Sequence, residues 1–136
     1  SNVAVDLGVN YLAVVVAAVA AVVIGILYYG LAGLGDRLAR LVGSTPVGRP
    51  GPAQLAIGVV VSLVNAWVLA LLALNLGASS LTDAVMLGVL VWLGFMATLS
   101  GAQVAFQGRP WNAWLITNAH DVVVQVVMGA IVTLWR

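Results

Sequence analysis

The stretch VNYLAVVVAAVAAVVIGILYYGLAGL, residues 9–34, carries no charged side chain. A transmembrane α-helix needs about 20 consecutive, mostly apolar residues to cross the hydrocarbon core of a bilayer, and this stretch is long enough. It is preceded by Asp6 and by no basic residue, whereas a secretory signal has a positively charged start and a shorter apolar core. We therefore predict that residues 9–34 form a retained transmembrane helix.

The whole chain shares this apolar character. Hydrophobic residues occupy 63% of its 136 positions and charged residues 7%, which lies far outside the balance of a soluble domain. The sequence therefore predicts an all-α, polytopic membrane protein, with four transmembrane helices in an antiparallel bundle and a single transmembrane domain over residues 1–136. The predicted spans are about residues 9–34, 53–76, 83–105 and 111–135.

Polar connections separate the predicted spans. The first connection, GDRLARLVGSTPVGRPGP at residues 35–52, contains three prolines and is typical of a loop, with an amphipathic turn at residues 36–42. Ser80 or Thr82 can cap the third span, and Pro110 suits the first turn of the fourth. The predicted architecture is thus four helices joined by short loops.

The positions of the charges predict the orientation in the membrane. All five basic residues are arginine, and four of them lie in the first and third connections: Arg37, Arg40, Arg49 and Arg109. Arginine-rich short loops stay in the cytoplasm, so we expect both termini and the second connection on the outer side. Asp6 and Asp83 fall on that outer side, and Arg136 is the exception.

Small residues recur at four-residue spacing on two spans. This spacing lets helix backbones approach closely where lipid provides no hydrophobic force for helix association. We interpret both sets as packing seams, either within one chain or between copies. The residues are Ala13, Ala17, Ala21 and Gly25 on the first span and Ala97, Gly101 and Ala105 on the third.

A polar stripe is predicted along the fourth span. At about 100° per residue, its members fall within about a third of the helix circumference. They are Trp114, Thr117, Asn118, Asp121, Gln125 and Met128. Asp121 lies roughly 15 Å from the cytoplasmic end of the helix, near the bilayer centre. The only histidine, His120, projects from the edge of the stripe, and because adjacent helical residues do not face each other, we expect no preformed pair with Asp121.

Polar side chains of other spans are expected to face this stripe. Counting from the cytoplasmic start of the second span places Asn65 at nearly the depth of Asp121, with Ser62 and Gly58 on the same face. The polar residues about one or two turns nearer the cytoplasm are Tyr28, Tyr29 and Thr98. We hypothesise that Asp121 and Asn65 meet at the midplane and that the tyrosines line the inner approach.

An ionisable side chain at the centre of a span is costly. An aspartate there costs about 2.5–3.5 kcal/mol on insertion scales, and such residues usually face a bundle interior or a water-filled cavity. The stripe is therefore a candidate site for a small solute or a proton. An equally weighted alternative is that Asp121 only holds helices together, with Asn65 as its partner.

Several chemistries lack support in the sequence. With no cysteine, no glutamate and one histidine, one chain cannot supply a zinc site, and only a homo-oligomer with His120 from each copy could hold a metal or haem. Ser62 and Ser100 lack a nucleophile elbow, and no glycine-rich phosphate loop occurs. The net charge of +1 gives no nucleic-acid signal. We predict no catalytic residue, no metal and no cofactor, and a membrane enzyme is the least favoured class.

Four blocks of the chain, in order, resemble a known family. They are IGILYYGLAGLGDRLARLVG at residues 24–43, WLGFMATLSG at 92–101, FQGRPWNAWLITNA at 106–119 and MGAIVTLW at 128–135. The sequence is similar to the bacterial membrane family catalogued as domain of unknown function 1761. The resemblance implies a small four-helix protein of the bacterial cytoplasmic membrane, and it implies no activity or ligand. Relatives tend to carry aromatic residues where this chain has His120 and Asp121.

The predicted function follows from the stripe. We expect a homo-oligomer embedded in membrane lipids, since four short helices enclose little volume and a pathway is easier to build where copies meet. The first hypothesis is a channel or transporter-like protein that handles a small solute or protons along the face of Asp121, Asn65, Gln125 and Tyr28. The alternative is a non-catalytic accessory or scaffold protein, whose stripe packs helices or docks a partner.

Overall fold

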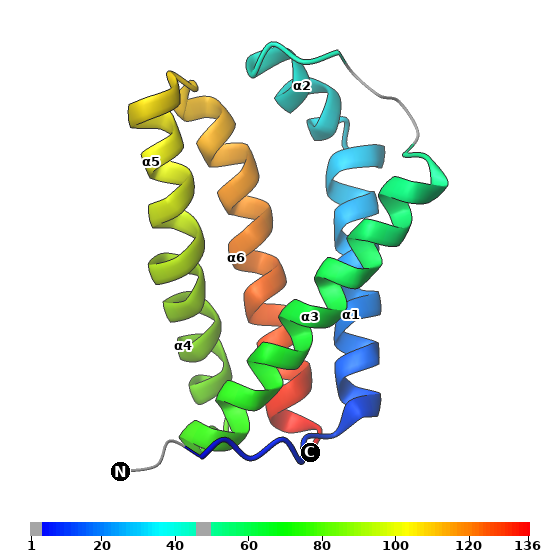
Figure 1. Cartoon of the computed structure of the whole chain (residues 1–136), viewed down its shortest axis with the longest axis vertical. Coiled ribbons are helices and arrows are strands. Elements are labelled where there is room, and N and C mark those ends of the chain that lie inside the picture. Colours follow the sequence, from blue (N-terminus) through cyan, green and yellow to red (C-terminus); the bar gives the residue numbers. More distant parts are fainter. Residues whose placement is uncertain (1–3, 46–49) are drawn as a thin grey trace.

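The computed structural model describes residues 4–45 and 50–136, and Figure 1 shows them as a bundle of long helices. The elements are α1 (Tyr11–Gly25), η1 (Ile26–Leu31), α2 (Leu34–Leu41), α3 (Pro52–Leu76), α4 (Leu81–Trp92), η2 (Leu93–Ala97), α5 (Thr98–Gln107) and α6 (Trp111–Leu134). The two η elements are π-helical segments. The described ranges contain no strand, and the predicted loop residue Arg49 lies outside them.

Four helices are long and apolar enough to cross a membrane. They cover Tyr11–Leu31, Pro52–Leu76, Leu81–Gln107 and Trp111–Leu134. The prediction of an all-α bundle with four spans is therefore confirmed, and each predicted boundary lies within a few residues of the observed one. The amphipathic turn predicted in the first connection is α2, whose Arg37 and Arg40 are exposed while Leu38 and Leu41 are half-buried.

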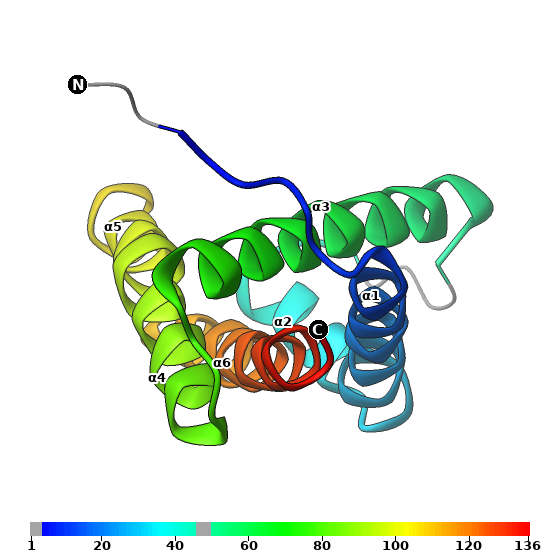
Figure 2. The same cartoon turned by 90° about the horizontal axis from the view of Figure 1, so that it is seen from below.

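Consecutive spans run in opposite directions. The segment before α1, the C-terminus and the α3–α4 turn lie at one end of the bundle, which we call the terminal end, while α2 and the α5–α6 turn lie at the other (Figure 1). Because α2 and that turn carry Arg37, Arg40 and Arg109, we call this the arginine end. Seen along the bundle, α6 lies between α4 and α1 (Figure 2), and it also packs against α3. The helix predicted to carry the polar stripe is thus enclosed by three others.

Local sequence signals set the helix ends. Asn10 caps α1 by accepting hydrogen bonds from two backbone N–H groups of its first turn, at 3.1 and 3.2 Å. Ser80, one of the two predicted caps, forms a capping box with Asp83 at the start of α4. Gly77 and Gly108 end α3 and α5 with φ angles of 74° and 69°, which other residues adopt only at a cost.

Hydrogen bonds close the terminal end of the bundle. The segment before α1 crosses beneath the helices (Figure 1), and there Asp6 and Asn75 exchange two hydrogen bonds of 2.9 Å between backbone and side chain. Arg136 donates to the carbonyl oxygen of Ala73 at 3.0 Å. The segment before α1 and the C-terminal residue are therefore both fastened to the last two turns of α3.

The first predicted packing seam lies inside the chain. Ala13, Ala17 and Ala21 are buried, and α1 packs against both α3 and α6. The core continues through the fully buried side chains of Leu69 on α3 and Met128 on α6. Small side chains on α1 thus let two neighbouring helices approach it closely.

Helices α4 and α6 approach each other closely at two glycines. A Cβ added to Gly88 of α4 would lie 2.8 Å from the carbonyl oxygen of Gln125 and 2.9 Å from the Cα of Val126. A Cβ added to Gly129 would lie 3.1 Å from the carbonyl oxygen of Ala84. Glycines at this crossing let the two backbones touch, a seam that the sequence analysis did not identify.

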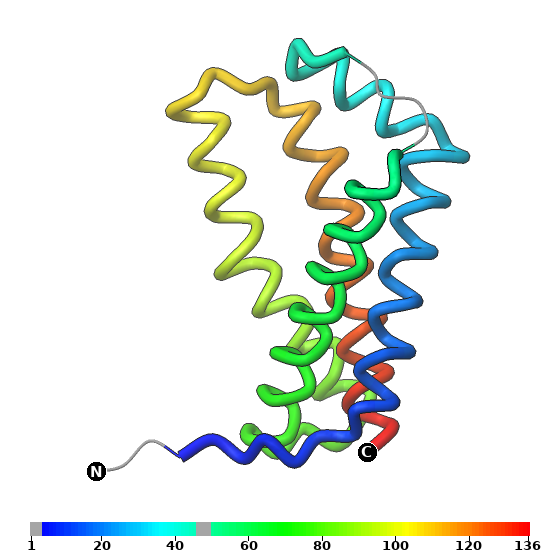
Figure 3. Tube along the Cα trace, turned by 45° about the vertical axis from the view of Figure 1, so that its right-hand side comes forward, coloured from blue at the N-terminus to red at the C-terminus, as the bar shows by residue number. Residues whose placement is uncertain are grey.

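The arginine-end half of α3 leaves the bundle. Residues 52–61 are all exposed, and a Cβ added to Gly58 would have no neighbour within 4 Å. Figure 3 shows α3 leaning across the other helices, so that this half diverges from α6. Burial of α3 starts at Ala66, and its packing contacts come from the terminal-end half.

Candidate functional site

His120 and Asp121 form a pair near the middle of α6. Nδ1 of His120 lies 2.9 Å from Oδ1 of Asp121, and the two side chains are 16% and 19% exposed. This corrects the expectation that the two would not pair. Their Cα–Cβ bonds do diverge, but each polar atom lies two bonds beyond Cβ, so both side chains can lean along the helix surface until these atoms meet.

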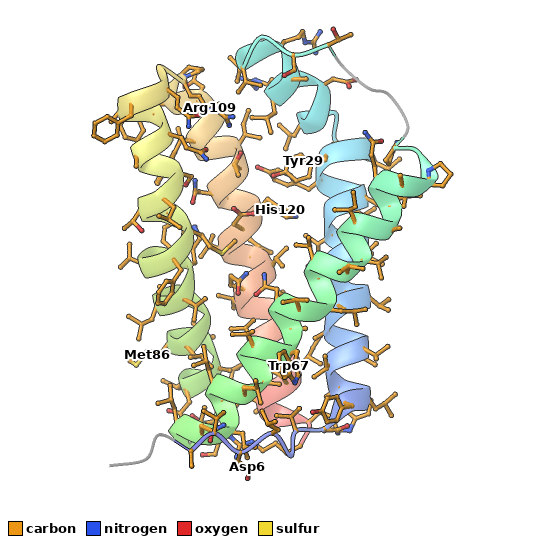
Figure 4. The ribbon with its side chains drawn as sticks, viewed as in Figure 1. Asp6, Tyr29, Trp67, Met86, Arg109 and His120 are labelled. Atoms are coloured by element: carbon orange, nitrogen blue, oxygen red, sulfur yellow. The ribbon has the colours of Figure 1, made fainter. Side chains whose placement is uncertain are left out.

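Two tyrosines of η1 pack on this histidine. The ring centroids of Tyr29 and His120 are 4.7 Å apart, and those of Tyr28 and His120 are 5.4 Å apart. The tyrosine rings meet edge to face at 5.0 Å. Figure 4 shows Tyr29 and His120 between α6 and α1, with Tyr29 nearer the arginine end. The residues predicted to line the approach thus contact the histidine directly.

The π-helical geometry of η1 explains how adjacent tyrosines reach one ring. A π turn closes i to i+5 hydrogen bonds, so each residue rotates less about the axis than in an α-helix and neighbouring side chains point in more similar directions. The Tyr28 hydroxyl also donates a hydrogen bond to the carbonyl oxygen of Ile116 on α6. This bond joins η1 to α6 one turn before His120.

The second ring nitrogen of His120 has no partner. Nε2 is buried, and among the described residues nothing donates to it or accepts from it. It faces α1 at Gly25, where an added Cβ would lie 3.8 Å away. When the carboxylate of Asp121 accepts the Nδ1 proton, the neutral ring leaves Nε2 as a free acceptor. The pair therefore offers a proton-binding atom that the protein itself leaves unused.

Asn118, another stripe residue, belongs to a separate network between α6 and the α4–η2–α5 helix. Its Oδ1 accepts from Trp92 Nε1 at 2.9 Å, and its Nδ2 donates to Ser100 Oγ at 3.0 Å and to the Trp114 carbonyl at 2.9 Å. The Trp114 indole donates to the Ala97 carbonyl at 3.1 Å. Asn118 is 2% exposed and uses both donor and acceptor, so its environment is that of a packing residue.

Gln125 and Thr117 complete the predicted stripe in different surroundings. Gln125 is fully buried beside Gly88, and neither atom of its amide has a hydrogen-bond partner in the described ranges. Thr117 is half-buried, one turn from Asp121 toward the arginine end. The stripe is therefore not one continuous polar path but a set of distinct environments.

Apart from the two tyrosines, the residues predicted from other spans do not gather at the His120–Asp121 pair. Asn65 and Ser62 are half-buried on α3 and form no side-chain hydrogen bond with any described residue. The predicted contact of Asn65 with Asp121 is not made, because α3 leans and equal residue counts from the helix ends no longer give equal heights (Figure 3). Thr98 is exposed and donates to the Gly94 carbonyl of its own helix at 2.8 Å.

Trp92 and Gly88 carry structural roles that the sequence analysis missed. Tryptophans of membrane proteins usually lie near the ends of a span. One in the middle of a span needs a hydrogen-bond acceptor for its indole N–H, so its position in the sequence predicts a polar neighbour. Gly88 follows Ala84 at the four-residue spacing of small residues, the same signal that identified the other seams. Neither signal names the helix on the other side.

The pair and the two tyrosines form a small cluster of hydrogen-bonding groups. No group of three or more histidine, cysteine, aspartate or glutamate side chains that could hold a metal occurs among residues 4–45 and 50–136. What the pair offers instead is one hydrogen-bonded carboxylate, one free imidazole nitrogen and two aromatic rings. These groups can take up a proton or hydrogen-bond a small polar molecule.

Comparison with known proteins places the chain in a family without adding a function. The model of the family described as protein of unknown function (DUF1761) matches residues 12–133, nearly the whole chain. No curated protein and no solved structure matches. Any functional conclusion must therefore come from the geometry of the site.

Proposed function

We propose a function from the site itself, because the chain belongs to DUF1761, a family of unknown function. The proposal is that this membrane protein binds and passes protons, or a small polar solute that carries one, at His120 and Asp121. The observation that supports it is the free, buried Nε2 of a histidine whose Nδ1 is held by a carboxylate. Within a membrane span, ionisable pairs of this kind mark proton and solute pathways.

Access to the site is proposed from the arginine end. His120 is the tenth residue of α6, roughly 15 Å from Trp111 at the arginine end. Toward the terminal end, α6 is buried at positions Val124, Gln125, Met128, Gly129, Val132 and Thr133. The side chains of His120 and Asp121 are 16% and 19% exposed, while the helix beyond them is packed, which favours a site open on one side over a continuous pore. By the positive-inside rule, the arginine end is cytoplasmic and both termini are outside.

A transporter-like cycle then requires a change of packing. The exposed half of α3 is weakly held by its neighbours, since residues 52–61 are all exposed. Its movement relative to α6 would alter the exposure of Asp121 without breaking the core around Leu69 and Met128. We propose this half of α3 as the moving part.

The alternative is an accessory or scaffold protein, and one observation favours it. Asn118, on the same stripe, has every polar atom bonded within the chain and holds α6 to its neighbour. If His120 and Asp121 act in the same way, the stripe serves helix packing alone. The two readings differ in whether the pair titrates while the protein stays folded.

The single histidine provides the test. In protein labelled with 15N-histidine and reconstituted in lipid, the ring nitrogens of His120 are the only signals from such a side chain. The proposal predicts that these signals change with pH while the fold stays intact, and that Asp121→Asn alters this response. Asp83→Asn, a change of an aspartate at the terminal end, is the matched control and should leave the His120 titration unchanged.

Flux measurements complete the test. Proteoliposomes with a pH gradient should dissipate it faster than empty liposomes, and Asp121→Asn and His120→Gln should remove the difference while Asp83→Asn retains it. If the His120 signals do not respond to pH and the gradient decays as in empty liposomes, the proton-handling proposal is wrong and the scaffold reading stands.

A further inference from the structure

The structure assigns most of both predicted small-residue seams to contacts inside one chain. Ala13, Ala17 and Ala21 are buried between α1 and its neighbours. On the third span, the Trp114 indole fills the space beside Gly101, where an added Cβ would lie 3.6 Å from its Nε1, and it donates to the Ala97 carbonyl. Ala105, the last residue of the third-span seam, is exposed, so neither seam offers a continuous row of free small residues to a second copy.

A third stripe, on α3, is only partly covered by the chain and makes no polar contact with the described residues. Gly58, Ser62 and Asn65 fall within an arc of about 60° at about 100° per residue. The space beside Gly58 is open to 4 Å, and neither Ser62 nor Asn65 bonds through its side chain to any described residue. The small residue and the short hydroxyl lie where another helix backbone could approach closely.

Lipid acyl chains cannot form hydrogen bonds with the carboxamide of Asn65. The residue lies near the middle of a 25-residue span of mean hydropathy 2.5, at a depth where acyl chains offer neither donors nor acceptors. A hydrogen bond from an asparagine in this position to a polar group on another helix stabilises the association of the two helices. Within the chain that group is missing, because α3 leans away from α6.

We propose that a second copy of this chain covers this stripe. Two copies inserted in the same orientation and related by a two-fold axis along the membrane normal place Asn65 and the partner's Asn65 at the same depth. A carboxamide both donates and accepts, so the two side chains are complementary to each other and can form paired N–H···O bonds. Gly58 and Ser62 extend the contact toward the arginine end. This interface does not depend on the proton-handling proposal.

Cross-linking tests the interface directly, because the chain contains no cysteine and single-cysteine variants need no background removal. Gly58→Cys and Ser62→Cys place a thiol on the stripe. Val60→Cys is the matched control, at nearly the same depth, 57% exposed and about 200° around the helix from Gly58. With a short bis-maleimide in native membranes, we expect cross-linked dimers from the two stripe variants and monomers from Val60→Cys.

The cross-linking results distinguish a second copy of this chain from another polypeptide as the partner of the α3 stripe. Dimers absent from both stripe variants, or formed equally by Val60→Cys, would overturn the proposal. A cross-link from the stripe to a protein of different mass would also overturn it, since the occupant would then be another polypeptide rather than a second copy.

Substitution of Asn65 tests the proposed bond. Fluorescence energy transfer between labelled copies, measured in liposomes over a range of protein-to-lipid ratios, gives the dimer dissociation constant. Asn65→Val should raise that constant about three- to thirty-fold, while Asn65→Gln, which keeps a carboxamide, should raise it less. An Asn65→Val protein that dimerises as tightly as the wild type would remove Asn65 from the interface and refute the pairing.

Discussion

The contact between α4 and α6 makes a quantitative prediction for Gly88→Ala. The added methyl group would lie 2.8 Å from the Gln125 carbonyl oxygen and 2.9 Å from the Val126 Cα, where ordinary contacts are 3.4–4 Å. Both neighbours belong to the backbone of α6, so no side-chain rotation relieves the clash. The helices must separate by several tenths of an ångström to about 1 Å, and gaps of that size forfeit a quarter to a half of each contact's attraction.

A matched substitution separates the free-energy cost of the clash from the gain in helix propensity. Alanine also favours a helix over glycine by about 1 kcal/mol, which opposes the clash in Gly88→Ala. Gly94, in the same span, has nothing within 4 Å of an added Cβ, so Gly94→Ala carries the helix-propensity gain alone. Overpacking typically costs about 1–3 kcal/mol. We therefore expect Gly88→Ala to be about 1–3 kcal/mol less stable than Gly94→Ala.

Reversible unfolding in mixed micelles measures this difference. Far-ultraviolet circular dichroism against the mole fraction of sodium dodecyl sulfate gives the free energy of unfolding for each variant, and only the difference between the two alanine variants is used. Equal stabilities, or a more stable Gly88→Ala, would show that the α4–α6 backbones are not in contact at Gly88, and the packing account of α6 would fail.

Three further predictions use the same unfolding measurement or the His120 spectrum. Gly77→Ala, at a φ of 74°, should cost about 1 kcal/mol, and an unchanged stability would argue against the left-handed turn after α3. Asn118→Leu should cost about 1–3 kcal/mol because it leaves the Trp92 indole N–H without its acceptor, and a neutral result would show that this N–H finds another partner. Tyr28→Phe keeps the ring but removes the hydrogen bond to α6, so it should cost about 1 kcal/mol and shift the His120 ring signals; an unchanged spectrum would place Tyr28 away from the site.

The parts of the fold that depend on local chemistry were predictable from the sequence. Uninterrupted apolar runs predicted the spans, because only a helix satisfies its own backbone in hydrocarbon. Ser80 with Asp83 three residues later is a capping signal that needs no tertiary information. The small residues from Ala13 to Ala21 predicted a close approach, although their partner helices could not be named.

The parts that depend on how helices lean were not predictable. The depth of Asn65 relative to Asp121 was calculated as if α3 stood parallel to α6. The angle between these helices is set by contacts spread along the chain. At the terminal end Asn75 is hydrogen-bonded to Asp6, whereas at the arginine end residues 52–61 are exposed and no described residue makes a comparable contact with α3. A sequence states which residues share a helix face but not the direction of that face in the folded bundle.

The polar residues of α6 differ in whether their polar atoms have hydrogen-bond partners within the fold. This difference is the best guide to their roles. Asn118 is buried with all of its bonding capacity used, which is how a packing residue avoids the cost of an unpaired polar group. Gln125 is buried with none of it used, and His120 keeps one nitrogen bonded and one free.

At His120 the local rules were also broken twice, by a histidine that pairs with its sequence neighbour and by the π-helical turn that brings two tyrosines against it. Departures from locally preferred geometry tend to persist where function requires them. A site whose role was only to hold helices together would gain stability from bonding its last polar atom, as Asn118 does. Gln125 is also unpaired, but an amide does not take up a proton. For this reason our proposal places the site at His120 and Asp121 rather than along the whole stripe.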